Sequence, residues 1–160
     1  MLIGLLGRIG SGKGTVAEEL VNTYGFRQDS FARTLKDATA ALFNWDRAML
    51  EGNTPESRAA REVVDEWWSE KLDIENFTPR LALQLLGTDV FRNHFHQDIW
   101  VLGVMARYKE GDNVVISDAR FPNEVASIRE MGGNIVQVDR GEEPKWWDCA
   151  VSATTATKVR

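Results

Sequence analysis

A glycine-rich stretch near the N-terminus, GLLGRIGSGKGTVAEEL at residues 4–20, constrains this chain more than any other segment. Leu2 to Leu6 is a short apolar run typical of a buried strand, and apolar residues recur at helical spacing from Lys13 to Tyr24. Because glycine costs entropy to order, such a density is expected only where the backbone must stay bare. Glycines between a strand and a helix let backbone N–H groups wrap around a polyphosphate, and the helix N-terminus adds partial positive charge. The stretch therefore predicts a phosphate-binding loop.

The lysine in this loop has the position that phosphate binding requires. Lys13 is placed to reach the β- and γ-phosphates, and Thr15 is placed near a magnesium ion. The common pattern has serine or threonine directly after the lysine, whereas Gly14 intervenes here. The alternative is a glycine-rich turn with a surface lysine, which the spacing and the strand–helix context disfavour. The expected polyphosphate-binding residues are Gly7, Arg8, Ile9, Gly10, Ser11, Gly12, Lys13, Gly14 and Thr15.

The rest of the chain alternates strands with helices. A parallel sheet covered by helices on both faces follows from this order, so we expect an α/β fold, a three-layer sandwich of the P-loop NTPase type. A length of 160 residues predicts a single domain. Thr54-Pro55 and Thr78-Pro79 each signal the start of a helix, the first of which we expect to run to about Leu72. The expected strands are residues 2–6, 26–31, 113–117 and 134–140.

A second candidate site follows the strand at residues 113–117, in the sequence VVISDARFPNE. Ligands of open parallel sheets bind beyond the carboxyl ends of the strands, which is where Asp118 and Arg120 fall. The carboxylate of Asp118 can hold Mg²⁺, directly or through water, and Arg120 can neutralise charge on a transferred phosphoryl group. The alternative is a helix-capping aspartate beside a surface arginine.

Three arginines in the middle of the chain suggest a site for an anionic acceptor. Arg80 and Arg92 flank the segment LALQLLGTDVF, and Arg47 follows Trp45. Guanidinium groups bind phosphate dianions through planar, paired hydrogen bonds. Each arginine taken singly also fits a solvated helix face, but as a set we expect some of them to line the acceptor site.

Charge and composition exclude several classes of function. A net charge of −5 argues against a general nucleic-acid or membrane-surface binder, so we expect small-molecule ligands. Cys149 is the one cysteine and cannot form an internal disulfide, which favours a reducing, cytoplasmic location. The sequence contains no run of 18 apolar residues that would predict a membrane span.

Four motifs in order along the chain resemble those of the bacteriophage deoxynucleoside monophosphate kinases. They are GRIGSGKGT, FARTLKDA, LALQLLGTDVFRNHFHQDIWV and SDARFPNEVASIREMGGNIVQVDR, and the third is the most specific of them. The resemblance implies that the Lys13 loop binds ATP with Mg²⁺ and that Asp118 and Arg120 take the catalytic acidic and basic positions. It also implies that the γ-phosphoryl group of ATP passes to a deoxynucleoside 5′-monophosphate. The residues implied to contact this acceptor nucleotide are Lys36, Arg47, Arg80, Trp100 and Glu124, to which the arginine pattern adds Arg92.

Some of these roles have alternatives. Trp100 could stack on the acceptor base, or it could be a core tryptophan on a helix. Arg140 lies where lid-side arginines of related kinases approach ATP. Arg33-Thr34 stands where family members often have a small or acidic residue followed by proline, so the acceptor loop can differ in shape. If the source is a phage, the expected location is the host cytoplasm.

The resemblance also divides the chain into regions. We expect a helical acceptor region at about residues 33–108 and a lid at about 140–160, with a helix formed by EEPKWWDCAVSA. Family chains usually continue into a final strand and helix, which residues 141–160 are not expected to provide, since TTATKVR is short and polar. The sheet edge would then be unpaired, or be covered by the lid helix or by a second subunit, which makes a homodimer one alternative.

Two rival functions remain open from the sequence. One is a P-loop kinase with another small acceptor, such as a dephospho-coenzyme or a sugar acid. The other is a module that binds or hydrolyses ATP without transferring the phosphoryl group. Release of ADP that depends on a nucleoside monophosphate would separate the first function from both rivals.

Overall fold

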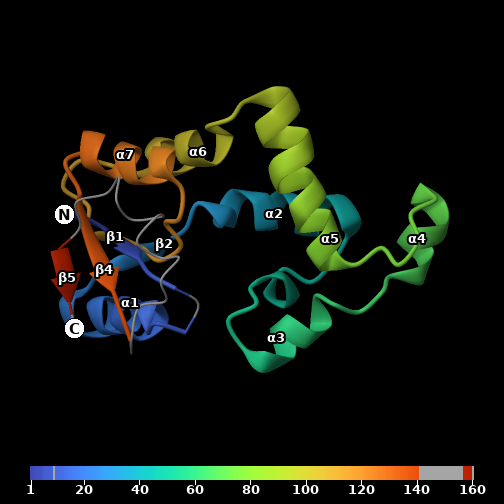
Figure 1. Cartoon of the computed structure of the whole chain (residues 1–160), viewed down its shortest axis with the longest axis horizontal. Coiled ribbons are helices and arrows are strands. Elements are labelled where there is room, and N and C mark those ends of the chain that lie inside the picture. Colours follow the sequence, from blue (N-terminus) through green and yellow to red (C-terminus); the bar gives the residue numbers. More distant parts are fainter. Residues whose placement is uncertain (9, 141–156, 160) are drawn as a thin grey trace. The chain divides into compact units, whose positions relative to one another are not determined.

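The computed structural model describes residues 1–8, 10–140 and 157–159. The chain divides into two compact units, one of residues 1–31 with 101–160 and one of residues 32–100 (Figure 1). The prediction of a single domain that contains a helical acceptor region stays a prediction. The second unit has an apolar core of its own, because the 69-residue excursion between the second and third strands is long enough to build one. The expected helical acceptor region begins with the second unit and extends past its end.

The first unit is built on an all-parallel sheet. The strand order is β2-β3-β1-β4-β5, so β1 is central and hydrogen-bonds to both β3 and β4. This confirms the predicted α/β class with a parallel sheet flanked by helices. The strands are β1 (Leu2–Leu6), β2 (Arg27–Asp29), β3 (Val114–Ile116), β4 (Asn134–Val138) and β5 (Thr157–Val159).

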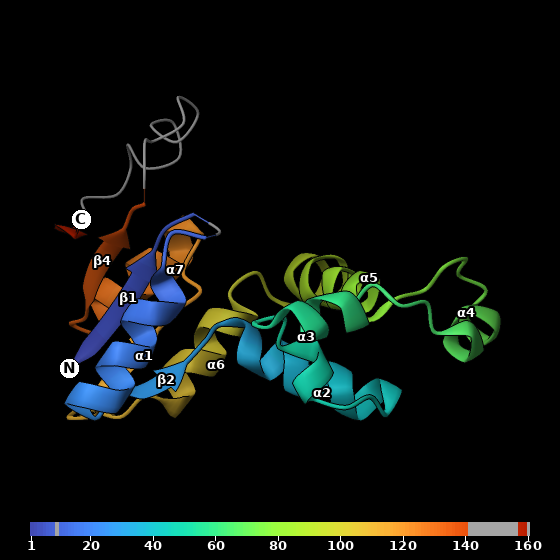
Figure 2. The same ribbon diagram turned by 90° about the horizontal axis from the view of Figure 1, so that it is seen from below.

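Helices cover both faces of this sheet, as Figure 2 shows for α1 (Lys13–Tyr24) and α7 (Pro122–Glu130). Successive side chains of a strand point to opposite faces. Leu5 of β1 packs with Ala17 of α1, whereas Ile128 of α7 lies against the neighbouring Gly4. The predicted bounds of the first helix are confirmed: it begins at Lys13 and stops at Gly25, which adopts the left-handed conformation.

The fifth strand corrects the prediction that nothing after Arg140 supplies one. Thr157–Val159 pairs in parallel with Val136–Val138 of β4. A strand at the edge of a sheet has one neighbour and needs less apolar surface than a central strand, so a polar segment can serve. The pairing covers this side of β4, and the homodimer alternative stays a prediction. The rest of the predicted lid, with its helix, falls on residues 141–156 and 160, outside the described residues.

The second unit is helical. Its core joins Phe43, Phe77 and Ala82, and the ring of Trp45 stacks on that of Phe43 with centroids 4.6 Å apart. The helix α6 (Ile99–Arg107) carries the chain back to the first unit. Nowhere in the described residues is a helix both long and apolar enough to cross a membrane. The elements of the second unit are α2 (Ala32–Phe43), η1 (Ala48–Leu50), α3 (Pro55–Ala60), α4 (Glu66–Leu72), α5 (Pro79–Gln84) and the π-helix η2 (Leu85–Phe95).

The single helix predicted from Thr54 to about Leu72 is wrong, because the chain forms two short helices there. Thr54 caps α3 as expected, by accepting a hydrogen bond from the backbone N–H of Ser57. Asp65 then adopts an extended conformation, donates its own N–H to the carbonyl of Phe77 and caps α4 by accepting from the N–H of Trp68. A second capping residue thus interrupts the apolar periodicity that predicted one helix.

A buried ion pair ties the end of β2 to the end of α6. Arg107 grips Asp29 in a paired arrangement, with Nε 3.1 Å from Oδ2 and Nη2 3.0 Å from Oδ1. The Asp29 side chain is 1% exposed. Burial by itself raises the pKa of this carboxyl, but the hydrogen bonds from Arg107, from the Ser30 N–H and from Arg27 outweigh it and lower the pKa below its ordinary value.

Asp29→Asn should lower the free energy of unfolding by about 3 kcal/mol at neutral pH, because it leaves Arg107 without its counter-charge. A lowered pKa in the folded state gives stability that is present above the unfolded value of 3.8 and is lost as the pH falls through the folded value. The gap between wild type and variant should therefore close on acidification. Urea unfolding followed from about pH 5 to about pH 2 measures it.

Asp73→Asn is the matched control, since Asp73 is an exposed aspartate in the left-handed conformation that asparagine also adopts. A constant gap across this pH range would show that the Asp29 carboxylate adds no pH-dependent stability.

Candidate active site

Three loops lie side by side because of the strand order. β1 pairs with β3 on one side and with β4 on the other, and all three strands run in the same direction. Their carboxyl ends are followed by residues 7–12, 117–121 and 139–140, respectively. Ligands of open parallel sheets bind at this position. The topology thus brings together the first unit's predicted donor and catalytic residues.

The loop after β1 can adopt its conformation only with glycine at several positions. Gly10 and Gly12 have φ values of +83° and +98°, in the left-handed region that residues with a Cβ rarely adopt. A Cβ at Gly7 would overlap the carbonyl oxygen of Val138 and lie 2.6 Å from Ser11 Oγ. Ser11 is 6% exposed, and its hydroxyl has no hydrogen-bond partner among the described residues. Ile9 lies outside those residues.

Lys13 folds back over this loop. Its Nζ donates to the carbonyls of Gly7, at 2.6 Å, and Arg8, at 2.7 Å. Burial, and then the nearby positive charge of Arg120, lower the pKa of the Lys13 ammonium. Because β1 pairs with β3, the loop that carries Arg120 lies beside the loop that carries Lys13, and two cations next to each other suit an anionic ligand.

The end of β4 is tied to the same loop. Arg8 Nη2 donates to the backbone carbonyl of Arg140 at 3.0 Å. The backbone of Arg140 therefore contacts the phosphate-binding loop. The donor role predicted for the Arg140 side chain remains a prediction.

Asp118 and Arg120 take different positions after β3. Asp118 is half-buried, and its Oδ1 accepts the backbone N–H of Phe31 at 2.9 Å. Arg120 is exposed, and its backbone N–H donates to Glu124 Oε2 at 2.9 Å. The carboxylate is thus held in a defined orientation, while the guanidinium can reach a ligand.

Glu124 has a structural role, and the acceptor contact that the resemblance implied for it stays a prediction. It is 2% exposed, and its Oε2 accepts the N–H groups of both Arg120 and Phe121, the latter at 3.1 Å. It therefore caps the start of α7 and fixes the backbone of the residue that carries the Arg120 guanidinium. A glutamate two positions after Phe121-Pro122 is a sequence signal for such a cap, and it could have predicted this role of Glu124.

In the second unit, the structure joins two of the predicted acceptor residues through Glu51. Lys36 Nζ lies 2.8 Å from one oxygen of this carboxylate, and Arg47 Nη1 lies 2.6 Å from the other. Arg47 also donates from Nε to Asp37. Burial lowers the pKa of the Arg47 guanidinium by itself, but the hydrogen bonds to Asp37 and Glu51 raise it overall. Glu51 was not predicted, because a lone glutamate gives no distinctive pattern.

Arg80 and Trp100 have partners of their own among the described residues. Arg80 pairs with Glu62 at 2.8 Å, and Arg92 lies in η2. Trp100 is 5% exposed, packs edge-on against Phe91 and donates its indole N–H to the carbonyl of Gly87 at 2.9 Å. Trp100 thus occupies the core, the second of the two alternatives.

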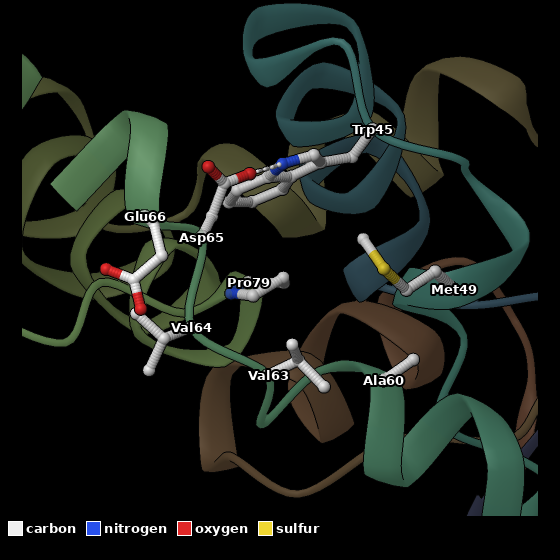
Figure 3. A pocket seen from close by; sticks show the side chains of 8 residues that line it. All are labelled: Trp45, Met49, Ala60, Val63, Val64, Asp65, Glu66 and Pro79. Atoms are coloured by element: carbon white, nitrogen blue, oxygen red, sulfur yellow. Dashed lines mark hydrogen bonds between the residues drawn. The ribbon is translucent and has the colours of Figure 1, made fainter.

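A mostly apolar hollow of about 330 Å³ lies within the second unit (Figure 3). Trp45 bounds it on one side, with its indole N–H donating to Asp65 at 2.7 Å. Sequence reasoning did not anticipate this hollow, because its walls come from four separate segments. The lining residues are Trp45, Met49, Ala60, Val63, Val64, Asp65, Glu66 and Pro79.

A glycine-rich loop closing on a lysine, at the carboxyl end of the central strand of a parallel sheet, defines the class of P-loop nucleotide-binding phosphotransferases. Comparison with known proteins is more specific. A family model described as deoxynucleotide monophosphate kinase matches residues 49–152. The chain is 34% identical to a protein of Acanthamoeba polyphaga mimivirus assigned as a deoxynucleotide monophosphate kinase, over 88% of this chain and 74% of that protein. It is 27% identical to the deoxynucleoside-5′-monophosphate kinase of Escherichia phage T5, over 81% of this chain and 72% of that protein.

The chain therefore belongs to the deoxynucleotide monophosphate kinase family, and it is a nucleoside monophosphate kinase. The predicted resemblance is confirmed, and both relatives are viral.

Glu124→Ala should lower kcat by about 10- to 100-fold with little change in the KM for the acceptor, because Arg120 loses its backbone anchor. Glu124→Gln keeps an oxygen that can accept both N–H groups and should retain most activity. Steady-state kinetics of both variants, with Glu130→Ala as an exposed control on the same helix, measure the effect. A rise in acceptor KM without a fall in kcat would instead indicate direct contact with the acceptor.

Proposed function

We propose that this kinase transfers the γ-phosphoryl group of ATP to a deoxynucleoside 5′-monophosphate in the presence of Mg²⁺, giving the diphosphate. The observation that carries the proposal is the convergence of Lys13 and Arg120 beside Asp118, at the carboxyl ends of two paired strands. Phosphoryl transfer requires little covalent chemistry from the protein, so cations and a metal-holding carboxylate held in position can suffice.

The described residues fit a polyphosphate donor. The bare backbone at Gly7, Gly10 and Gly12 gives access to N–H groups, and the unpartnered Ser11 hydroxyl can add a hydrogen bond. The Lys13 ammonium, now satisfied only by loop carbonyls, can exchange those partners for phosphate oxygens. Gly14 and Thr15 complete the predicted donor site in the first turn of α1.

Magnesium would be held here largely by the donor's own phosphates. The described part of the chain contains no group of three or more acidic, histidine or cysteine side chains placed to hold a metal. Mg²⁺ prefers oxygen ligands, keeps several waters and commonly binds through one or two carboxylates plus substrate phosphates. The Thr15 hydroxyl and the Asp118 carboxylate, directly or through water, are the donors that this chain offers. The metal would neutralise charge on the phosphate oxygens.

Catalysis then rests on positioning and on charge. Lys13 and Arg120 stabilise the negative charge that spreads over the transferred group, and no residue needs to be modified covalently. In the second unit, we propose Lys36, Arg47, Arg80 and Arg92 as candidates to hold the acceptor. With a net charge of −5, small nucleotides are favoured over nucleic acids as ligands, and the viral relatives support a place in the host cytoplasm.

A coupled assay of ADP release against the four deoxynucleoside monophosphates and their ribose counterparts tests this function. Wild-type protein should release ADP only with an acceptor present, with a higher kcat/KM for dGMP than for GMP. Lys13→Ala should fold normally and lose about 10²- to 10³-fold in rate, since the lost charge acts in the transition state. Acceptor-independent ADP release would favour a hydrolysing module, and release with another small acceptor would favour a different kinase.

Asp118→Asn should raise the Mg²⁺ concentration needed for half-maximal activity by about tenfold or more, because a neutral amide holds the metal shell poorly. The amide oxygen can still accept the N–H of Phe31, so the side chain should keep its orientation. A magnesium titration of both proteins makes the comparison, with Asp73→Asn as the control. Identical titration curves would make Asp118 a structural residue.

A further inference from the structure

The cations of the second unit differ in whether an internal carboxylate already neutralises them. Lys36, Arg47 and Arg80 each have a carboxylate oxygen within 2.8 Å. Arg61 has no ion pair or side-chain hydrogen bond with any described residue, and its Nε is shielded from solvent without a partner. Its guanidinium is therefore a partly buried positive charge that lacks an anion.

The surroundings of Arg61 hold this charge in place. Its guanidinium lies against Gly52, where φ is +64° and where a Cβ would overlap the guanidinium atoms. The backbone N–H of Arg80 donates to the Arg61 carbonyl at 3.0 Å, which brings a second arginine beside the first. Arg58 lies three residues earlier, at the helical spacing that places side chains on one face.

The electrostatics of the site favour an added anion. Burial, and then the positive charge of Arg80, lower the pKa of Arg61, while Glu62 and Glu51 oppose this less strongly. Both of those carboxylates are already bound, Glu62 by Arg80 and Glu51 by Lys36 and Arg47. A group with several anionic oxygens could satisfy Arg61 and relieve the repulsion among the three arginines.

We infer that Arg61, with Arg58 and Arg80 beside it, binds the 5′-phosphate of the acceptor nucleotide. The identity of the ligand rests on the proposed function, because the acceptor is the phosphate monoester dianion that such a kinase must hold. Arg61 was not predicted from the sequence, and neither was Arg58. Arg61 differs in this respect from Lys36 and Arg47, whose charges are already balanced within the protein.

The test compares wild type with Arg61→Gln, using each of the four deoxynucleoside monophosphates as the acceptor. We expect the acceptor KM to rise by about 10- to 100-fold, with the KM for ATP within twofold of wild type. Arg61→Lys keeps the charge but loses the planar fork, so its acceptor KM should lie between those of wild type and Arg61→Gln. Lys71→Gln removes one positive charge from an exposed position in the same unit and should change neither constant.

Titration with inorganic phosphate, followed by calorimetry, separates this inference from the proposed function. If wild type releases ADP with an acceptor but Arg61→Gln has an unchanged acceptor KM, the inference is overturned and the function stands. If no acceptor supports ADP release, the function fails, and weaker phosphate binding by the variant would still support the anion site, whereas equal binding would overturn it. If a thermal unfolding scan shows that Arg61→Gln does not fold, the acceptor KM and the phosphate affinity of Arg61→Lys test the inference instead.

Discussion

The parallel pairing of β1 with both β3 and β4 is the constraint on which the donor side of this kinase depends. It places three strand ends in a row, so the phosphate-binding loop, the Asp118 segment and the end of β4 share one edge of the sheet. Side chains that are more than 100 residues apart in the sequence can then act on one phosphate group. The hydrogen bonds from Arg8 to the Arg140 carbonyl and from Phe31 to Asp118 are local consequences of that pairing.

Much of the first unit could be predicted because its signals are local. The helix from Lys13 to Tyr24 shows apolar residues at helical spacing and ends at a left-handed glycine. The buried strands are short, continuous apolar runs, such as the valines and isoleucine of β3. β5 was missed because an edge strand is specified by its partner β4 and not by its own composition. The helix expected from Thr54 onward was split because Asp65 donates its backbone N–H to the carbonyl of Phe77, which is distant in sequence, and accepts the N–H of Trp68. Such tertiary choices leave no trace in a pattern of apolar residues.

The candidate site also contains residues that could be predicted from the sequence and residues that could not. Lys13 could be proposed because it closes a glycine-rich loop between a strand and a helix, and Asp118 and Arg120 because they come just after a strand. Their roles stay predictions until tested. The sequence could not distinguish an exposed polar group from one with an internal partner. Glu124 caps α7 from a buried position and Trp100 donates its indole N–H within the core, and motif position alone could show neither. Arg61 shows the reverse case, because its importance arises from a missing partner.

The ion pair between Asp29 and Arg107 joins the two points at which the helical insertion leaves and re-enters the sheet unit. Asp29 is two residues before the last residue of the outgoing segment, and Arg107 ends the helix that returns. Because this ion pair holds both connecting segments within the sheet unit, changes within residues 32–100 need not disturb the strand ends that precede the phosphate-binding loop and the Asp118 segment. The fold is thus modular: substitutions can accumulate in the insertion while the strand ends of the sheet unit keep their arrangement.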